Sequence, residues 1–542
     1  MNSPQTITGN VVDVITQTIT PAQVTFDKGI ITAITPTTEL CSKYILPGFI
    51  DAHIHIESSM LVPSEFARLA LPHGTIGTIS DPHEIANVCG VDGVKYMIDN
   101  GNKVPFYFYF GAPSCVPATP FETAGATINS TDIHAMLQWD GIYYLSEMMN
   151  YPGVLNADEE VMRKIASAKQ LNKPIDGHLP GIMGNDTIAY INAGISTDHE
   201  CFTYAEALHK IQHGMKVLIR EGSAAKNFDA LIPLLDEYPH MIMFCSDDKH
   251  PNELMRGHLN EIAARAVAFG CNVMNVMRAL THNVKQHYNL PHGMLQVGDS
   301  ADFITVDNLT NFNVSSTFIK GIKVAQDGKA LFSTVKEKEI NQFNINAITI
   351  ADIQLNISTD TRVNVIVPKD GQLVTTATQA TIHASTQNNV AEDVLKIVVV
   401  NRYNKAPPAI AYIKNIGLKT AAIASTVAHD SHNIVACGSS DEFILQAINE
   451  LIHCKGGISY ADVDGVKSLA LPVGGLMSTD DGYVIGALYE ALDELAKQAG
   501  STLRAPYMTL SFMALLVIPA LKLSDKGLFD GTEFKFTNLI TS

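Results

Sequence analysis

The chain is poor in charge, in tryptophan and in paired cysteine. Of its 542 residues only 17% are charged and one is Trp, whereas 46% are hydrophobic. The 8 Cys are scattered singly with no C-x-x-C pair, so neither a thiolate zinc site nor a disulfide framework is expected. Reduced thiols in a cytoplasmic protein are expected instead. The composition excludes a disordered chain and predicts about three folded domains.

Positive charge is also scarce. Lys and Arg total 37 against 55 Asp and Glu, a formal net charge of -18, which argues against nucleic acid or a membrane surface as the main partner. The N-terminus has no signal-peptide pattern. The longest apolar run, residues 507–521, is shorter than the roughly 20 residues of a membrane helix and contains Pro519. We therefore expect a small-molecule partner and predict that this run lies in the core.

Two β-rich flanks enclose the middle of the chain. Residues 6–46 alternate apolar and polar side chains in short β-branched pieces. Residues 294–331 return to the same pattern, with Gly-Asp and Asp-Gly turns. We predict that the flanks combine into one small β-sandwich domain, residues 1–47 plus 290–345.

The middle region alternates short apolar runs with stretches of helical period, such as residues 157–172. This alternation predicts a parallel sheet covered by helices. Eight apolar runs in about 245 residues are typical of a (β/α)8 barrel, which we place at residues 48–289. One run contains the aromatic stretch of residues 106–110, in which aromatics at period two favour the barrel core over a ligand-stacking surface.

The C-terminal residues 346–542 mix predicted strands with one clear helix. Ser439, Ser440 and Asp441 are good N-cap residues, and they precede the amphipathic run EFILQAINELIH. The pattern indicates an additional C-terminal domain that contains both helices and strands (α/β or α+β).

Metal-ligand and acid-base residues stand at the carboxyl ends of nearly all eight barrel runs. A (β/α)8 barrel builds its active site from those ends, so these side chains are expected to converge. Other His residues, such as His73 and His134, are assigned to ordinary core or surface roles. The strand-end residues are His53, His55, Asp81, His83, Glu84, Ser114, Cys115, Glu147, His178, His199, Glu200, Arg220, Glu221, Asp247 and Asp248.

Five of these strand ends favour a catalytic metal centre. His53 and His55 alternate along one strand, so both imidazoles point to the same face and can hold one ion. A carboxylate such as Glu147 could bridge two ions. Taken alone, however, a Glu at a strand end is usually a solvated loop residue, and an H-x-H motif there is usually not a metal site. Their joint occurrence on five strands makes coincidence improbable. The candidate metal ligands are His53, His55, Glu147, His178, His199 and Asp247.

Imidazole and carboxylate ligands suit Zn, Mn or Fe(II). Such ions activate water, and Asp247 could take the water proton and deliver it to a leaving group, so we predict hydrolysis at a carbon that bears nitrogen or oxygen. His83 and Glu84 begin like the H-E-x-x-H motif of metalloproteases, but Asn87 occupies its fifth position.

The segment PGFIDAHIH (residues 47–55), followed by the strand-end His178, His199 and Asp247, resembles the amidohydrolase superfamily. Within that superfamily the sequence is similar to the adenine deaminase branch over nearly the whole chain, including the C-terminal domain. The segments that carry this resemblance are residues 55–60, 81–88, 146–150, 176–178, 198–200, 220–223 and 429–433.

The resemblance implies hydrolysis of adenine to hypoxanthine and ammonia in cytoplasmic purine salvage. It implies a binuclear Mn²⁺ centre, with Fe²⁺ or Zn²⁺, or a single ion, as alternatives. No Lys ends the fourth strand, so Glu147 replaces the carboxylated Lys that bridges many relatives. In this assignment His53, His55 and Asp247 hold one ion, His178 and His199 hold the other, and Glu147 is the bridge.

The departure of ammonia also requires protonation of the purine ring. An acid other than Asp247 would be useful for that step. Glu84 is our second catalytic candidate, and it could contact ring nitrogens. Glu221 could also contact ring nitrogens, and Arg220 or Ser114 could line the pocket. A solvated or helix-capping role is the alternative for Glu84 and for these three residues. His83 could be a further metal ligand or only a hydrogen-bond partner of one. The predicted substrate-binding residues are His83, Ser114, Arg220 and Glu221.

Three metal-capable residues of the C-terminal region, His429, Asp430 and His432, lie within four positions. They could reach over the barrel mouth and contribute to the site, or they could form a hydrogen-bonded loop. Other functions remain open: a cyclic amidase or deacetylase of the same superfamily, or a non-catalytic relative that serves in assembly. A homodimer is expected because oligomers are common for this architecture.

Overall fold

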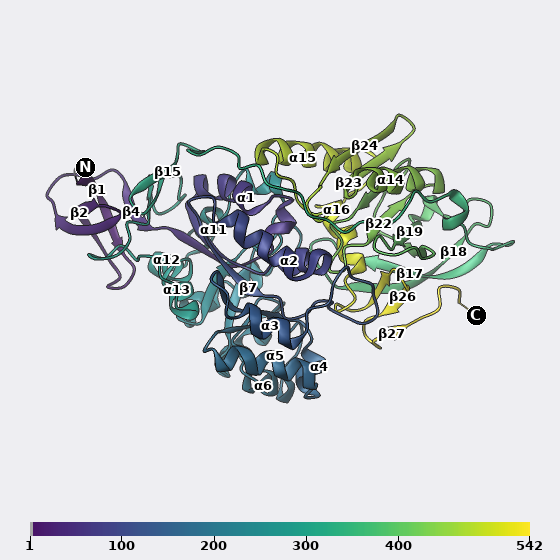
Figure 1. Cartoon of the computed structure of the whole chain (residues 1–542), viewed down its shortest axis with the longest axis horizontal. Helices are drawn as coiled ribbons and strands as arrows, with labels where there is room; N and C mark the ends of the chain where they lie inside the picture. Colours follow the sequence, from purple (N-terminus) through teal and green to yellow (C-terminus); the bar gives the residue numbers. More distant parts are fainter. Residues whose placement is uncertain (1–3, 542) are drawn as a thin grey trace.

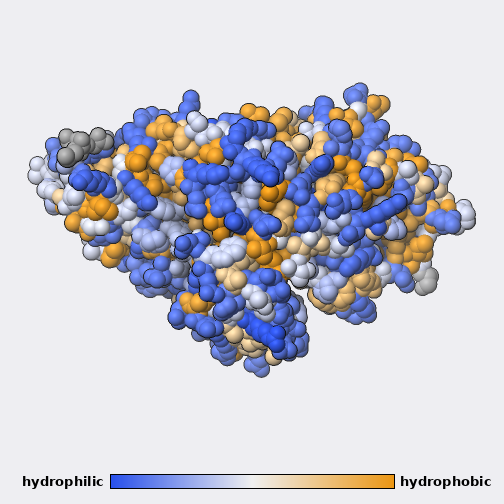
Figure 2. Space-filling view, viewed as in Figure 1, coloured by the Kyte–Doolittle hydropathy of each residue, from blue (hydrophilic) through white to orange (hydrophobic). Residues whose placement is uncertain are grey.

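The computed structural model describes residues 4–541. Along its long axis, Figure 1 shows the N-terminal strands at one end, the helix-covered barrel in the middle and the C-terminal domain at the other end. The face drawn in Figure 2 carries mostly hydrophilic side chains with small hydrophobic groups between them. Among the described residues, no helix is long and apolar enough to cross a membrane.

The two flanks form one eight-stranded sheet, as predicted. Its order is β16-β15-β14-β13-β4-β1-β2-β3, so strands from both flanks meet where β13 pairs with β4. The sheet folds over on itself, because Phe26 of β2 meets Phe303 of β13 with ring centroids 5.6 Å apart. The strands are β1 (Gln5–Asp13), β2 (Thr18–Asp27), β3 (Ile30–Pro36), β4 (Tyr44–Pro47), β13 (Phe303–Val306), β14 (Val314–Ile319), β15 (Ile322–Gln326) and β16 (Lys329–Ala330).

All eight predicted barrel strands are present, as parallel ladders from β5 to β9 and from β10 to β12. Backbone hydrogen bonds close the ring: Ser196 N donates to Ile175 O (2.9 Å), and Asp247 N donates to His53 O (3.0 Å). The strands are β5 (Phe49–Ile54), β6 (Thr75–Ser80), β7 (Tyr107–Ala112), β8 (Ile142–Met148), β9 (Ile175–Gly177), β10 (Thr197–Asp198), β11 (Lys216–Arg220) and β12 (Ile242–Cys245).

Helices cover the barrel, and their buried stripes face it. In α5, for example, Asp158 caps the first turn by accepting from Val161 N, and the apolar side chains at 161, 165 and 168 are buried. The aromatic residues of β7 belong to the core, since Tyr109 and Phe110 are buried. The helices are α1 (Pro63–Ala70), α2 (His83–Gly101), α3 (Ser130–Met136), α4 (Tyr151–Leu155), α5 (Glu159–Gln170), α6 (Asn185–Asn192), α7 (Tyr204–Gln212), α8 (Phe228–Leu231), α9 (Leu234–Glu237), α10 (Pro251–Leu254), α11 (Leu259–Phe269), α12 (Val273–Ala279) and α13 (His282–Tyr288).

The C-terminal domain is built on a mixed sheet of order β18-β17-β20-β19-β22-β21-β23-β24. The predicted helix is α14, capped by Ser440, and the apolar run of residues 507–521 is buried in α16 and the turns after it. The elements are β17 (Thr361–Pro368), β18 (Thr375–Ile382), β19 (Leu395–Val400), β20 (Ala409–Ile413), β21 (Ala422–Ser425), β22 (Ile434–Gly438), α14 (Asp441–Cys454), β23 (Gly457–Asp462), β24 (Gly465–Ala470), α15 (Gly482–Gln498), α16 (Pro506–Ser511), β25 (Leu521–Ser524), β26 (Gly527–Asp530) and β27 (Lys535–Phe536).

The segment between β21 and β22, here called the C-terminal loop (Ala428–Asn433), brings this domain to the barrel mouth. Asn433 Nδ2 donates to Thr123 O (2.9 Å), which lies in the long segment after β7. Thr123 N in turn donates to Asp525 Oδ1 (2.9 Å) of the C-terminal domain. These bonds fix the loop above the carboxyl ends of the barrel strands.

Candidate metal centre and substrate cavity

Three predicted ligands from the first and last barrel strands converge on one point. His53 Nε2 and His55 Nε2 lie 3.2 Å apart, and each lies within 3.4 Å of Asp247 Oδ1. The backbone fixes this arrangement, because His55 N donates to Asp247 O (3.1 Å) across the barrel seam. His55 Nδ1 donates to Asp81 O (3.2 Å), which leaves Nε2 free to bind.

Glu147 lies between this group and two further imidazoles. Its Oε1 is 3.2 Å from His55 Nε2, while its Oε2 is 2.7 Å from His178 Nδ1 and 3.4 Å from His199 Nε2. His178 and His199 follow the short strands β9 and β10, and both are buried. The structure therefore brings all six predicted ligands together, with Glu147 in the middle.

The cluster is electrostatically paired. Burial raises the pKa of the Glu147 carboxyl, but His178 and His199 outweigh burial and hold the pKa well below its usual range. Burial likewise lowers the pKa of His199, but Glu147, the largest of the opposing contributions, helps to raise it to about 9. The carboxylates are thus ionised and able to bind cations.

These residues fit one or two divalent cations. His53 Nε2 and His55 Nε2 face each other. Two neutral imidazoles in this arrangement can share only one proton, so at least one of the two nitrogens has a lone pair. His178 Nε2 is buried and has no hydrogen-bond partner among residues 4–541. Several overlapping groups of three or four side chains meet the spacing of a metal site. Imidazole and carboxylate donors suit Zn, Mn and Fe(II).

Arg220 was predicted to bind substrate but lies behind the cluster. Its guanidinium Nη1 donates to Asp247 Oδ2 (2.8 Å), and Nη2 donates to Glu200 Oε2 (3.2 Å). Burial raises the pKa of the Asp247 carboxyl, but Arg220, His53 and His55 hold it well below its usual range. The geometry thus gives Arg220 an orienting contact with Asp247.

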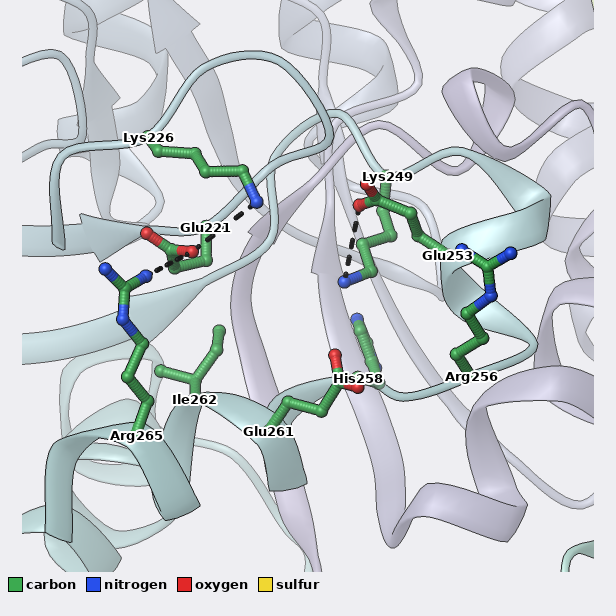
Figure 3. A pocket seen from close by; sticks show the side chains of 9 residues that line it. All are labelled: Glu221, Lys226, Lys249, Glu253, Arg256, His258, Glu261, Ile262 and Arg265. Carbon is green, nitrogen blue, oxygen red and sulfur yellow. Dashed lines mark ion pairs between the residues drawn. The ribbon is translucent and has the colours of Figure 1, made fainter. Parts of the chain in front are cut away.

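Glu221 does not reach the cluster, contrary to our prediction. Successive residues at a strand end point to opposite faces, so Glu221 points outward when Arg220 points inward. Its Oε2 lies 2.8 Å from Arg265 Nη1 and 3.6 Å from Lys226 Nζ. Figure 3 shows these three side chains at the edge of a separate surface hollow of about 300 Å³.

Ser114 is buried beside the cluster but does not line the cavity. Its hydroxyl donates to the backbone oxygen of Glu147, at the end of β8. The geometry therefore has Ser114 hold the backbone of Glu147 instead of lining the pocket, as we predicted it would.

His83 and Glu84, at the start of α2, do line the cavity, and the C-terminal loop contacts both of them there. His83 Nδ1 donates to Asp81 Oδ2 (3.1 Å), and His83 Nε2 lies 3.7 Å from Asp430 Oδ1. Glu84 Oε1 lies 2.5 Å from His429 Nδ1, and Oε2 contacts His432 Nε2. The cavity is lined by His55, His83, Glu84, Glu147, Met149, His178, His199, Glu200, Asp247, His429, Asp430 and Leu515.

Sequence reasoning missed several residues of this cavity. Glu200 was noted as a strand-end residue but was not placed in the site, although its neighbour His199 was. Glu57 does not line the cavity but is buried in the turn after β5, where its Oε1 accepts from Ile85 N (3.2 Å). Burial and Glu84 raise the pKa of its carboxyl to about 7. Only its position after the H-x-H motif could have indicated it. Met149 and Leu515 are apolar. They lie in segments noted from the sequence, residues 146–150 and 507–521, but neither was placed in the site.

A (β/α)8 barrel with imidazoles and carboxylates gathered at its strand ends defines the class of metal-dependent hydrolases. Residues 44–324 match the family model described as amidohydrolase family, and residues 372–535 match the model of the adenine deaminase C-terminal domain. The chain is 52% identical over 528 residues to an adenine deaminase of Sulfurovum sp. (strain NBC37-1), covering 97% of this chain and 98% of that protein.

Two further relatives agree over the same length. The chain is 48% identical to an adenine deaminase of Methanosarcina barkeri, with 99% of each chain covered, and 48% identical to one of Salinibacter ruber, with 98% of each covered. The chain belongs to the adenine deaminase family of the amidohydrolases.

Proposed function

We propose that the protein hydrolyses adenine to hypoxanthine and ammonia. The observation that carries this proposal is the cluster of four imidazoles around Glu147 and Asp247, in a chain that resembles adenine deaminases from end to end. The same reaction implies a role in purine salvage in the cytoplasm. A homodimer is proposed because oligomers are common among proteins of this architecture.

The proposed cofactor is a binuclear Mn²⁺ centre, with Fe²⁺ or Zn²⁺ as alternatives. His53, His55 and Asp247 would hold one ion and His178 and His199 the other, with Glu147 shared between them. When bound, divalent cations would supply Lewis acidity, which lowers the pKa of water and so provides a nucleophile near neutral pH.

Asp247 is proposed as the general base and acid. It would accept the proton of the attacking water and deliver it to the amino group that leaves C6 of adenine. The contact from Arg220 Nη1 to Asp247 Oδ2 orients this carboxylate, since it fixes one oxygen and leaves Oδ1 directed at His53 and His55.

The face of the cavity opposite Asp247 is proposed to bind the purine. His83 Nε2 and Asp430 Oδ2 are buried without hydrogen-bond partners among the described residues, so the substrate is the natural partner for both. Glu84 lies with them in the cavity wall and is proposed to contact the ring nitrogens and to take part in their protonation. His429 would contribute to the same wall.

The deciding experiment is expression with added Mn(II), followed by a metal count by mass spectrometry and an assay of purine absorbance. Adenine absorbance should fall with formation of hypoxanthine, while adenosine, guanine and cytosine in parallel reactions should change little. A protein that holds two metal ions per chain and leaves adenine unchanged would sink the substrate assignment.

A further inference from the structure

One imidazole of the C-terminal loop lies behind the cavity and not in its wall. His432 is fully buried, and its Nε2 contacts Oε2 of Glu84. The other oxygen of Glu84 faces His429 Nδ1 at 2.5 Å. The carboxylate of a barrel residue is therefore held between two imidazoles of another domain.

The backbone of the C-terminal loop fixes the tautomer of His432. Ala428 N donates to His432 Nδ1 (3.2 Å), so Nδ1 is the acceptor and carries no proton. A neutral ring then carries its proton on Nε2, which is the atom that faces Glu84. His432 N also donates to Ala428 O (2.8 Å), so the loop holds the residue at two points.

This arrangement gives Glu84 one orientation. The atom that carries the proton of a neutral His432 ring, Nε2, lies in contact with Oε2 of Glu84, so the contact needs no positive charge on the ring. Each carboxylate oxygen keeps a free lone pair, because a carboxylate accepts about four hydrogen bonds in total. Since Glu84 also lines the cavity, these lone pairs are available to an N–H group of a bound molecule.

We propose that His432 is a positioning residue, which holds Glu84 as an oriented acceptor for an N–H group of the purine substrate. This inference rests on the deamination proposed above and gives the C-terminal domain a part in it. The barrel supplies the carboxylate, and the C-terminal domain supplies the donor that sets its direction. Neither part of the chain forms this contact alone.

The first test compares His432→Asn with His432→Gln in the full-length, Mn(II)-loaded protein. A Gln amide can place an N–H near the position of Nε2, whereas the shorter Asn amide lies near Nδ1. We expect kcat/KM for adenine to fall about 10- to 100-fold in His432→Asn, as for other partners of active-site groups. His432→Gln should recover most of the loss, and both variants should bind as much metal as the wild type.

The second test asks whether His432 acts through Glu84. In a Glu84→Gln background, His432→Asn should cause little further loss of kcat/KM, because the group that it orients is already altered. His292→Asn is the control: His292 is equally buried but bonds to Tyr109 far from Glu84, so its effect on kcat/KM should be small and additive.

Equal losses in the Asn and Gln variants, or additive losses with Glu84→Gln, would overturn the inference. A double-mutant cycle on the free energy of unfolding adds a readout that needs no substrate: coupling between His432 and Glu84 is expected, and its absence would reject the contact. Failure of the wild-type protein to deaminate adenine would instead refute the function proposed above.

Discussion

The cavity has two walls that the chain builds in different ways. The first, here called the strand wall, carries His55 and Asp247, which follow strands β5 and β12 and are joined by a backbone hydrogen bond. The second, here called the loop wall, carries His429 and Asp430 on the C-terminal loop. Backbone ladders fix the strand wall, whereas side-chain bonds such as Asn433 to Thr123 fix the loop wall.

The difference separates two tasks. Cation ligands must hold a fixed geometry, and residues on strands of a rigid barrel provide it. The loop wall offers Asp430 Oδ2, a buried acceptor that has no hydrogen-bond partner among residues 4–541, and this suits the binding of a substrate that enters and leaves. The strand wall is thus suited to the ions, and the loop wall to substrate recognition.

The largest effect is expected where the strand wall carries the chemistry. Asp247→Asn should lower kcat by about 10² to 10⁴-fold, because the proposed proton carrier is lost. Most of the metal should remain, since five other ligands are intact. Stopped assays with a parallel metal count would check this, and undiminished turnover would reject Asp247 as the base.

Glu147→Gln tests whether the strand wall depends on its central carboxylate. An amide has no charge to share between two cations, so the variant should lose metal, about one of two equivalents, and most of its activity with it. Elemental analysis after gel filtration would measure this. A metal content equal to that of the wild type would argue against the bridge.

Asp430→Asn should affect the loop wall alone. The variant loses a buried carboxylate that faces the cavity, and we expect kcat/KM for adenine to fall about 5- to 150-fold, which corresponds to about 1 to 3 kcal/mol. The bound metal should not change. Loss of metal in this variant would contradict the division between the two walls.

The smallest effect is a pH dependence of the free energy of unfolding, which we attribute to Glu122 in the segment after β7. Burial and then the charge of Asp430 raise the pKa of Glu122 to about 8 from its usual 4.5. The folded state therefore binds this proton more tightly than the unfolded state, so its contribution to stability is complete below about pH 4.5 and is lost as the pH rises to about 8. Glu122→Gln cannot lose a proton there.

Thermal unfolding of wild type and Glu122→Gln between pH 5 and 8 would measure this contribution. From pH 5 to pH 8, the Tm of the variant should rise by a few degrees relative to the Tm of the wild type. A constant difference in Tm across the range would show that Glu122 does not titrate in this way.

The strand wall could be predicted from the sequence, because each ligand ends an apolar run and barrel strands all end at one mouth. The fold was predictable for the same reason. The eight runs became eight strands, and the two flanks shared one pattern and one sheet. Ser440 and the run that follows it likewise marked the one helix of the C-terminal domain that we predicted.

The loop wall could be suspected but not placed. His429, Asp430 and His432 stand in a loop, where no period fixes which way a side chain points. Contacts such as His432 with Glu84 join residues that are far apart in the chain, and only the packing of the domains brings them together. The error at Glu221 has a simpler origin: strand parity allows only one of two successive residues to face inward.

The sheet of the two flanks has a consequence for synthesis of the chain. Strand β4 pairs with β13, and Pro47 lies opposite Phe303 in that ladder. At about 5 to 20 residues per second, a ribosome needs roughly 10 to 50 s to supply the missing partner. During this interval the edge of β4 is unpaired and open to pairing with other chains. Production in cells should therefore be sensitive to temperature and to chaperones until residue 303 has emerged.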